Sequence, residues 1–567
     1  MDAPVWIFPS HSNSRRFPIQ GSTTMPITRR SSLLASGAAL GALGARPASA
    51  QAALTRGGTL IYLEQQPHTP LYPPAGGFYP NGGVLNQITD KLTYQNPRTL
   101  EIEPWIAENW TVGADAKEYT FRLRPGVTFS DGSPLDAAAV AKNYDTFGLG
   151  SRELRLPVSE VISNYEGSEV LDPLTVRFRF SRPAPGFLQG TAVIGSGLVS
   201  LRTLTLPLEA MGDATKIIGS GPFVVTNQVL GREMTMVARR DYAWGPAKHP
   251  HQGRALLDGI RYVITPEDSV RIGALVAGQA QVIRQIQAYD EAEVKGKGFQ
   301  IFAPSTRGIN NSVVFRPDNP LVSDLKVRQA LLHGTNAKEI VDTLFSANYP
   351  QATSIIASTA EGYVDHSAKL AFDPALAARL LDEAGWRPGA GGVRQKDGRP
   401  LALTAYESPP QPQNKDTLQL VAQQWAKLGV RLTVLAGDAG SRVLDSLDPA
   451  KTPVAPAMVG RADPDVIRSQ YHPLTRNVLL QAGGVSNRVQ SFTDPKLNAL
   501  LDGIASEPDR AKRLALVAEV QGYVLDQAYA IPIFEEPQVF AASPRVRDLA
   551  FEAVGRPSFY ATWLAAR

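Results

Sequence analysis

Short strand-like segments alternate with helix-start signals along most of this chain, and this alternation restricts the fold more than any other feature. Asp373-Pro374 and Asp494-Pro495 each place an N-capping carboxylate directly before proline, which is favoured at the first helical position. A helix predicted over 415–428 ends at Gly429 and leads into a strand over 430–434. Strands and helices that alternate at such short intervals favour an α/β fold of layered sheets and helices.

The stretch 118–140, EYTFRLRPGVTFSDGSPLDAAAV, carries several charges and invites comparison with a functional site. Its first half alternates apolar and polar residues, which predicts a strand with one buried face. Asp131-Gly132 then predicts a turn. Ser133 is predicted as a helix N-cap, with Pro134 at the first helical position and Asp136 completing a capping box. Each polar residue therefore has a local structural role, and we interpret the stretch as scaffold.

Residues 1–50 are predicted to be an export signal that is cleaved after Ala50. Arg29-Arg30 precedes a weakly apolar run rich in Ala and Gly, and Ala48-Ser49-Ala50 follows that run. The segment around Arg29-Arg30 resembles a twin-arginine motif, the tag of a route that exports folded proteins. The run is too short for a membrane helix of about 20 residues. Met25 would give a signal of ordinary length and is the expected start of translation.

The charge of the chain is concentrated in this leader. Its 50 residues hold five arginines and one acidic residue, whereas the whole chain holds 57 basic and 53 acidic residues. The remainder is therefore formally neutral, which argues against nucleic-acid binding driven by counterion release. The chain has no cysteine, which excludes disulfides, thiol nucleophiles, Cys-ligated clusters and a lipid anchor on cysteine. We expect an exported protein that is free in the periplasm.

Eight segments resemble, in order, stretches of extracellular solute-binding protein family 5, which serves ABC importers of peptides, opines and nickel. They cover nearly the whole chain after the leader. The segments are EPWIAENW, EYTFRLRPGVTFSDGSPLDAAAV, GSGPFVV with RRDYAWG, DLKVRQALLHGTNAKEIV, FDPALAARLLDEAGW, VAQQWAKLGVRLTV, GRADPD, and SNRVQSFTDPKLNALL with IPIF.

The resemblance implies an α/β, two-lobed periplasmic-binding-protein type II fold with mixed sheets and an inserted subdomain. Lobe I would combine 51–95, 205–300 and 531–567, the subdomain would span 96–204, and lobe II would span 301–530. The solute would sit between the lobes and be buried when they close.

Asp463, in VGRADPDVI, is the first candidate for ligand contact. The resemblance implies that an aspartate in this Gly-x-x-Asp stretch meets the α-ammonium of a peptide ligand, and an unpaired buried charge would be costly. The alternative is that Asp463-Pro464 is another helix N-cap. Arg461 would bind a ligand carboxylate or phosphate through its guanidinium, or else form an internal ion pair or a surface charge.

Three further residues are candidate ligand contacts. Tyr406, just past a predicted strand, offers a stacking face and a hydroxyl, or else packs in the core. His68 lies on the first loop after the first strand and would reach the cleft, or else is a solvated loop histidine. Asn311 would bond a ligand backbone, or else close a turn. No catalytic residue, metal site or cofactor is predicted.

The expected function is that of the periplasmic substrate-binding component of an ABC importer, which captures a peptide or similar small amino compound. It would act as a monomer and deliver the solute to a membrane permease pair driven by ATPase subunits, because the chain has no Walker-type Gly-Lys loop of its own. A nickel chelate, an opine or a glycoside is the alternative solute. An exported enzyme is the alternative from another class, although no GxGxxG unit or GxSxG elbow is present.

Overall fold

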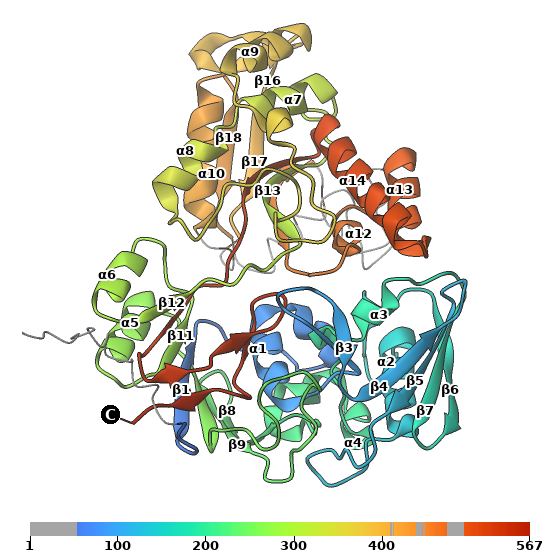
Figure 1. Cartoon of the computed structure of the whole chain (residues 1–567). Coiled ribbons are helices and arrows are strands. Elements are labelled where there is room, and N and C mark those ends of the chain that lie inside the picture. Colours follow the sequence, from blue (N-terminus) through green and yellow to red (C-terminus); the bar gives the residue numbers. More distant parts are fainter. Residues whose placement is uncertain are drawn as a thin grey trace, which may run out of the picture. The chain divides into compact units, whose positions relative to one another are not determined.

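The computed structural model describes residues 54–408, 411, 413–437, 445, 448, 450–472 and 493–566. The predicted export signal, 1–50, lies outside these residues. Ala53–Arg567 form one compact unit, in which sheets and helices alternate as predicted (Figure 1). No helix among the described residues combines the length and apolar character needed to cross a lipid bilayer.

The largest sheet has seven strands and is the framework of lobe I. Strand β1 pairs in parallel with β10 and β11. The other neighbouring strands of this sheet pair antiparallel, so the sheet is mixed as predicted. The order is β12 (Gln300–Phe302), β21 (Phe540–Ala542), β11 (Val282–Arg284), β1 (Thr59–Glu64), β10 (Gly259–Ile264), β9 (Glu233–Ala238) and β8 (Phe223–Val229). The helices of this region are α1 (Tyr79–Ile88), α4 (Leu201–Leu204), α5 (Asp268–Val276) and α6 (Glu291–Gly296).

A four-stranded antiparallel sheet lies within the range predicted for the subdomain. Its order is β4 (Ala107–Val112), β5 (Glu118–Leu123), β7 (Thr175–Phe180) and β6 (Tyr165–Asp172). The helix α2 (Ala137–Leu149) packs on β6 and β7, and α3 (Phe187–Gly190) completes the region (Figure 1). The strand predicted in the charged stretch 118–140 is confirmed as β5, and its apolar face is buried.

The predicted N-cap of α2 is wrong by three residues. Asp136, and not Ser133, is the N-cap, and its carboxylate accepts a hydrogen bond from the backbone amide of Ala139 at 2.9 Å. Thr128 and Pro134 form a β-bridge, and the amide of Leu135 donates to the carbonyl of Val127. This pairing keeps residues 133–135 extended, so the helix begins only after it.

Replacing Asp136 by alanine is expected to lower the free energy of unfolding by about 1 kcal/mol, since an N-cap carboxylate satisfies a free amide at the helix start. Ser133→Ala is the matched control, because the Ser133 hydroxyl bonds the exposed Asp131 side chain instead. Urea unfolding of both variants measures the difference. Equal losses in the two variants would contradict the assignment of Asp136 as the cap.

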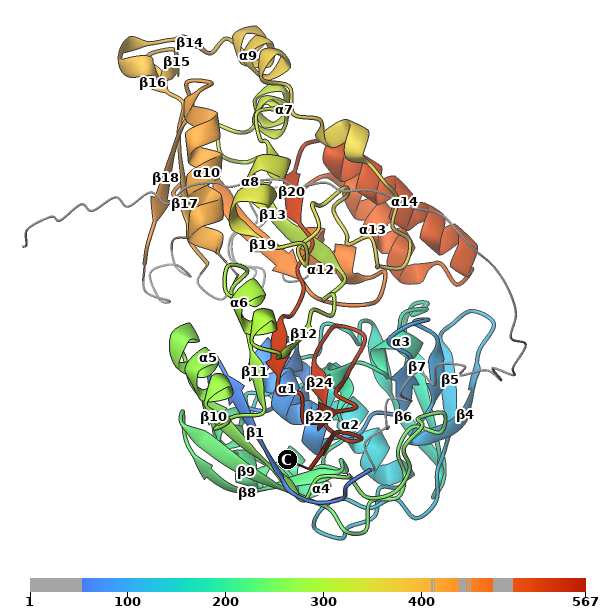
Figure 2. The same cartoon turned by 60° about the vertical axis from the view of Figure 1, so that its left-hand side comes forward.

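Lobe II is built on two smaller sheets and the helices around them. One sheet is antiparallel, in the order β19 (Val454–Val459), β13 (Ile309–Phe315) and β20 (Ala530–Phe534). The other pairs β17 (Ala402–Tyr406) and β18 (Arg431–Leu435) in parallel, with α10 (Asn414–Ala426) along it (Figure 2). The remaining helices are α7 (Leu325–His333), α8 (Ala337–Leu344), α9 (Pro374–Glu383), α12 (Val466–Tyr471), α13 (Pro495–Ser506) and α14 (Arg510–Asp526).

Short ribbons complete the described fold. They are β2 (Thr93–Gln95) with β3 (Ile102–Pro104), β14 (Arg387–Pro388) with β15 (Arg394–Lys396) and β16 (Arg399–Pro400), β22 (Val546–Arg547) with β25 (Trp563–Leu564), and β23 (Ala550–Phe551) with β24 (Pro557–Ser558). One continuous apolar core joins the seven-stranded sheet to the four-stranded sheet. Two further cores lie within lobe II, and one of them extends to β1 and β11 of lobe I.

The chain passes between the two lobes over 303–308 and again over 535–539. These two hinge segments are paired with each other: Ser305 and Pro537 form a β-bridge, and the Thr306 amide donates to the Glu536 carbonyl at 3.0 Å. The predicted lobe boundaries, at 300/301 and 530/531, stay predictions.

A buried polar chain runs from lobe I through the hinge into lobe II. Arg284 of β11 pairs with Glu64 of β1 at 2.5 Å and donates to the Oε1 of Gln538. Gln538 in turn donates to Glu536 at 3.0 Å, and Glu536 accepts from Asn311 of β13 at 2.7 Å. All five side chains are buried. A buried polar chain of this kind stabilises the protein only when every member has a partner. The relative position of the two lobes therefore depends on these contacts.

The stability of the protein is expected to depend on the charge of Glu536. Burial raises the pKa of this carboxyl to about 6 from 4.5, although Asn311, Arg284 and Gln538 act in the opposite direction. Because this pKa is higher in the folded protein than in the unfolded chain, the protonated carboxyl contributes to stability. The contribution is fully present below about pH 4.5 and is lost as the pH rises through about 6. The loss should reach about 2 kcal/mol, at about 1.4 kcal/mol per pKa unit.

Urea unfolding of the wild type and of Glu536→Gln at several pH values between 4.5 and 7 measures this loss. The amide cannot ionise, so the difference between the two proteins should change across this range. A difference that stays constant with pH would contradict a raised pKa for Glu536.

Candidate functional site

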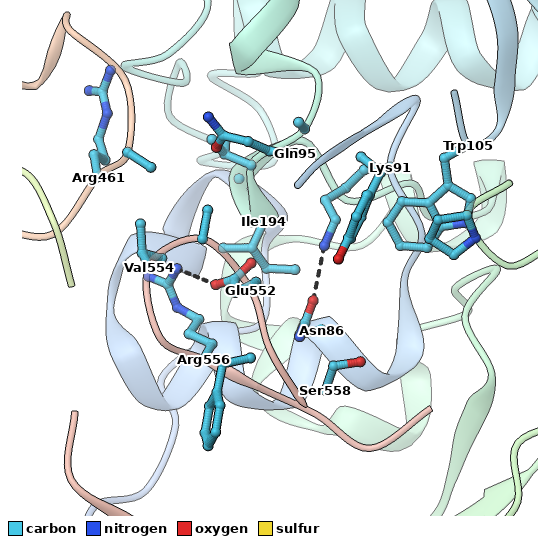
Figure 3. A pocket seen from close by; sticks show the side chains of 18 of the residues that line it. Asn86, Lys91, Gln95, Trp105, Ile194, Arg461, Glu552, Val554, Arg556 and Ser558 are labelled. Carbon is cyan, nitrogen blue, oxygen red and sulfur yellow. Dashed lines mark hydrogen bonds and ion pairs between the residues drawn. The ribbon is translucent and has the colours of Figure 1, made fainter. Parts of the chain in front are cut away.

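A pocket that is partly open to solvent lies between lobe I and the loop that follows β19 in lobe II. Lobe I together with the predicted subdomain contributes most of the wall, through the segment after α1, residues 192–195 and the ribbon of β23 and β24. Lobe II contributes Gly460, Arg461 and Ala462. The pocket is therefore in the position in which a two-lobed binding protein would hold its solute (Figure 3).

Aromatic side chains form much of the wall that lobe I contributes. Trp105, Tyr94, Tyr242 and Tyr560 all line the pocket. The indole nitrogen of Trp105 donates to the carbonyl of Trp244 at 3.0 Å, which fixes the ring. A fixed aromatic wall buries apolar parts of a ligand at low entropic cost.

Lys91 is the most deeply buried cation of this wall. Only 3% of the residue is exposed, and its ammonium donates to the Oδ1 of Asn86 at 2.9 Å and lies 5.1 Å from the ring centre of Trp105 (Figure 3). Burial lowers the pKa of Lys91, while the carboxylates of Glu552 and Asp90 act against this. Burial makes the charged form of Lys91 less favourable, and an anion bound beside the ammonium would offset that cost.

The backbone on both sides of Lys91 is fixed by hydrogen bonds. The amide of Asp90 donates to the hydroxyl of Ser220 and the carbonyl of Asp90 accepts from the amide of Leu198. The carbonyl of Leu92 accepts from the amide of Ala107, and the Leu92 side chain is in the core. The position of Lys91 is therefore set by the fold.

Asp90 lies on the other side of the same backbone. Its carboxylate accepts from Tyr242 and from the indole of Trp244, at 3.0 and 2.8 Å. Burial raises the pKa of Asp90 to about 7, against the effect of these donors. The carboxylate of Asp90 is thus directed to these two donors, and it forms no ion pair with Lys91.

A second charged pair lies on the ribbon of β23 and β24. Arg556 donates to Glu552 at 2.7 Å and also to the carbonyl of Gly77. Both side chains line the pocket, and Figure 3 shows the pair beside Lys91. Their charges balance each other, so this pair presents hydrogen-bonding atoms without a net charge.

Arg461 is the charged residue of the lobe II loop. Its guanidinium forms two hydrogen bonds to Asp463, at 2.8 and 2.5 Å, and lies 3.7 Å from Glu160 of the subdomain. Burial alone would raise the pKa of Asp463, but the guanidinium of Arg461 holds that pKa below its ordinary value. The pair is a strong, charge-assisted one.

This loop also packs tightly on the hinge. Gly308 has a φ of +76°, and a Cβ there would lie 2.3 Å from the carbonyl oxygen of Val459 and 2.8 Å from the amide nitrogen of Arg461. Only glycine allows both the conformation and the close approach. The loop that carries Arg461 is therefore held directly against the first hinge segment.

The structure brings together two of the five predicted contact residues. Arg461 lines the pocket, and Asp463 is bound to it from behind and does not line the pocket itself. The alternative helix cap is wrong for Asp463, because α12 begins after Asp465. The internal ion pair considered for Arg461 is present. Whether either residue touches a ligand stays a prediction.

The other three predicted residues lie away from the pocket wall. The hydroxyl of Tyr406 donates to Asp445 at 2.6 Å. His68 donates through Nδ1 to the Thr69 carbonyl and accepts at Nε2 from Gln228, and burial lowers its pKa. Asn311 belongs to the hinge chain described above and lies inside β13, not in a turn. Their predicted ligand contacts stay predictions.

Sequence reasoning missed Lys91, Trp105, Glu552 and Arg556. Helix α1 ends at Ile88 and β2 begins at Thr93, so Lys91 lies on the connection between them. Polar and apolar residues are mixed over 84–95, so nothing in the spacing there marks Lys91. Among the described residues no group of three or more His, Cys, Asp or Glu side chains is arranged to hold a metal ion.

Comparison with known proteins agrees with this geometry. Residues 101–472 match the model of the bacterial extracellular solute-binding proteins, family 5 Middle. Curated relatives include the glutathione-binding proteins GsiB of Salmonella paratyphi A and Escherichia coli (strain K12), which are 28% and 27% identical over 379 residues. These matches cover 65% of this chain and 68% of each relative.

Solved structures with the same fold carry different ligands. NikA from Brucella suis in complex with Fe(III)-EDTA has a TM-score of 0.74 at 23% identity, over 89% of this chain and 100% of that one. The oligopeptide-binding protein AppA from Bacillus subtilis in complex with a nonapeptide has a TM-score of 0.73 at 18% identity, over 90% and 100%. The predicted two-lobed fold is thus confirmed. With its family model matched over most of its length, the chain belongs to the bacterial extracellular solute-binding proteins of family 5.

Proposed function

We propose that this protein is the substrate-binding component of an ABC importer and that it captures a peptide or similar small amino compound in the pocket between its lobes. The observation that carries the proposal is the pocket itself, which joins an aromatic wall, buried charged groups of lobe I and the Arg461 loop of lobe II. The named ligands of the relatives, glutathione and peptides, support this class of solute.

The protein would act by binding alone. The solute enters between the lobes, its apolar parts pack on Trp105 and the neighbouring rings, and its polar groups replace water at the charged side chains. Closure then brings the Arg461 loop against the solute through rotation at the two hinge segments. The solute shifts the equilibrium between the open and closed forms only as far as it binds the closed form more tightly. Residues of both lobes that contact the solute at the same time therefore control closure.

The partners and location follow from the same proposal. The closed protein would dock on a membrane permease pair driven by ATPase subunits, and it would do so as a monomer. The leader predicted over 1–50 would be cleaved and would send the protein, without a lipid anchor, to the periplasm.

Gentle purification of the protein from its native host, followed by mass spectrometry of the small molecules released on denaturation, tests the proposal. A released peptide or amino compound that rebinds in isothermal titration supports it. Nickel or another metal in the released fraction would point to a chelate instead, and an opine or glycoside would be recognised by mass. Steady conversion of the released molecule into a product would show an enzyme and would end the proposal.

A further inference from the structure

The charges that line the pocket are balanced by ion pairs, with Lys91 as the exception. Arg461 is paired with Asp463 and lies near Glu160, and Arg556 is paired with Glu552. Among the described residues the Lys91 ammonium forms no ion pair, although 97% of the residue is buried, and the carboxylates of Glu552 and Asp90 act on it without direct contact. The pocket therefore holds one buried positive charge without an ion-pair partner.

The known contacts of Lys91 leave part of its hydrogen-bonding capacity unused. An ammonium has three N–H donors and no acceptor. Asn86 takes one of these donors, and the face of Trp105 lies on another side of the ammonium. Asn86 is itself held, because its amide donates to the carbonyl of Pro557 at 2.9 Å. Lys91 is also one of the residues that line the pocket.

We propose that Lys91 is a specificity-determining residue whose ammonium binds a carboxylate of the solute. This inference rests on the proposed function, and it narrows the solute to one that carries a carboxylate next to an apolar part. Burying a lone charge is costly, and a buried counter-ion with good geometry offsets that cost. The aromatic wall beside Lys91 would pack the apolar part of the same solute.

The surroundings of Lys91 differ from those of a cation that only stabilises the fold. The fold fixes the backbone at Asp90 and Leu92 by long-range hydrogen bonds, and it directs the Asp90 carboxylate to Tyr242 and Trp244. The acid adjacent in sequence therefore does not serve as the counter-ion. A carboxylate brought by the solute would be the first partner of opposite charge in contact with Lys91.

Two peptide libraries of two to four residues test the inference. One library has free C-terminal carboxylates, and the other has the same sequences with C-terminal amides, both without Asp or Glu. An equal mixture is equilibrated with the protein, and the retained peptides are quantified by mass spectrometry after gel filtration. The best-retained peptide and its amide are then titrated into the wild type, Lys91→Met and the control Lys248→Met.

The wild type should retain the free acids preferentially. Lys91→Met should bind the acid at least about thirtyfold more weakly, as expected when one partner of a buried charge pair is removed, and should bind the amide nearly unchanged. Lys248→Met makes the same substitution at a lysine whose side chain is 68% exposed and which does not line the pocket, and it should behave as the wild type.

The other outcomes contradict the inference alone, or the inference together with the proposed function. Retention of acids and amides alike by the wild type, or an acid preference that persists in Lys91→Met, overturns the inference but leaves the proposed function intact. Retention of neither library contradicts the proposed peptide-binding function and the inference with it. Lys91→Gln and thermal unfolding show whether a variant is folded. If neither variant folds, an acid preference that is kept in Arg461→Met supports the inference, and one that is lost there overturns it.

Discussion

Replacing Arg284 by methionine is expected to lower the free energy of unfolding by about 3–5 kcal/mol, because the change leaves the fully buried Glu64 carboxylate without its cation. The guanidinium is also the donor to Gln538 and lies 3.9 Å from the ring centre of Tyr79. Its loss therefore breaks the polar chain at its first link. Urea unfolding, monitored by circular dichroism, measures the effect.

The double variant Glu64→Gln with Arg284→Met is the matched control. It removes both charges, so no buried ion remains unpaired, and part of the lost stability should return. A double variant that is less stable than Arg284→Met, or a single variant that loses less than about 1 kcal/mol, would show that the pair is not the source of stability that its burial suggests.

Replacing Asp463 by alanine is expected to weaken solute binding by about 3 kcal/mol, or roughly a hundredfold. The physical reason is that Arg461 loses its two hydrogen bonds to Asp463, while its contacts with Ser469 and Glu160 stay. The effect is placed at the lower end of the range for broken buried pairs because these two contacts stay. Isothermal titration with the solute recovered from the native host measures it.

The same variant separates two roles for Asp463. If the carboxylate meets the ammonium of a peptide directly, Asp463→Ala should weaken binding of a free peptide much more than of its N-acetylated form. If it acts by holding Arg461, both forms should lose affinity equally, and Asp463→Ala in an Arg461→Met background should cost little more. A variant with unchanged affinity for both forms would remove the Arg461–Asp463 pair from the binding mechanism.

Much of the secondary structure was predictable because helix starts depend on local chemistry. Asp373 and Asp494 cap their helices as the sequence indicates, each accepting a hydrogen bond from an amide two or three residues on. The cap at Asp136 was missed because a bridge between Thr128 and Pro134 delays the helix. That bridge is a tertiary feature that capping rules do not contain.

The pocket was less predictable, for a related reason. The helix before Lys91 ends where the carbonyl of Ile88 accepts a hydrogen bond from Gly221, which is more than 130 residues away in sequence. Glu552 and Arg556 reach the same pocket from the C-terminal end of the chain. Neither contact has a signature in residue spacing, whereas Arg461 was found because it lies in a motif that resembles its relatives.

The position of β21 has a consequence for how the molecule is made. This strand comes from the last thirty residues of the chain, yet it lies between β12 and β11 inside the seven-stranded sheet. The sheet of lobe I therefore cannot close until residue 542 has been synthesised, and the sheet of lobe II likewise waits for β20, which ends only shortly before β21. A nascent chain truncated before Phe540 should expose the unpaired edges of β11 and β12 to chaperones or proteases.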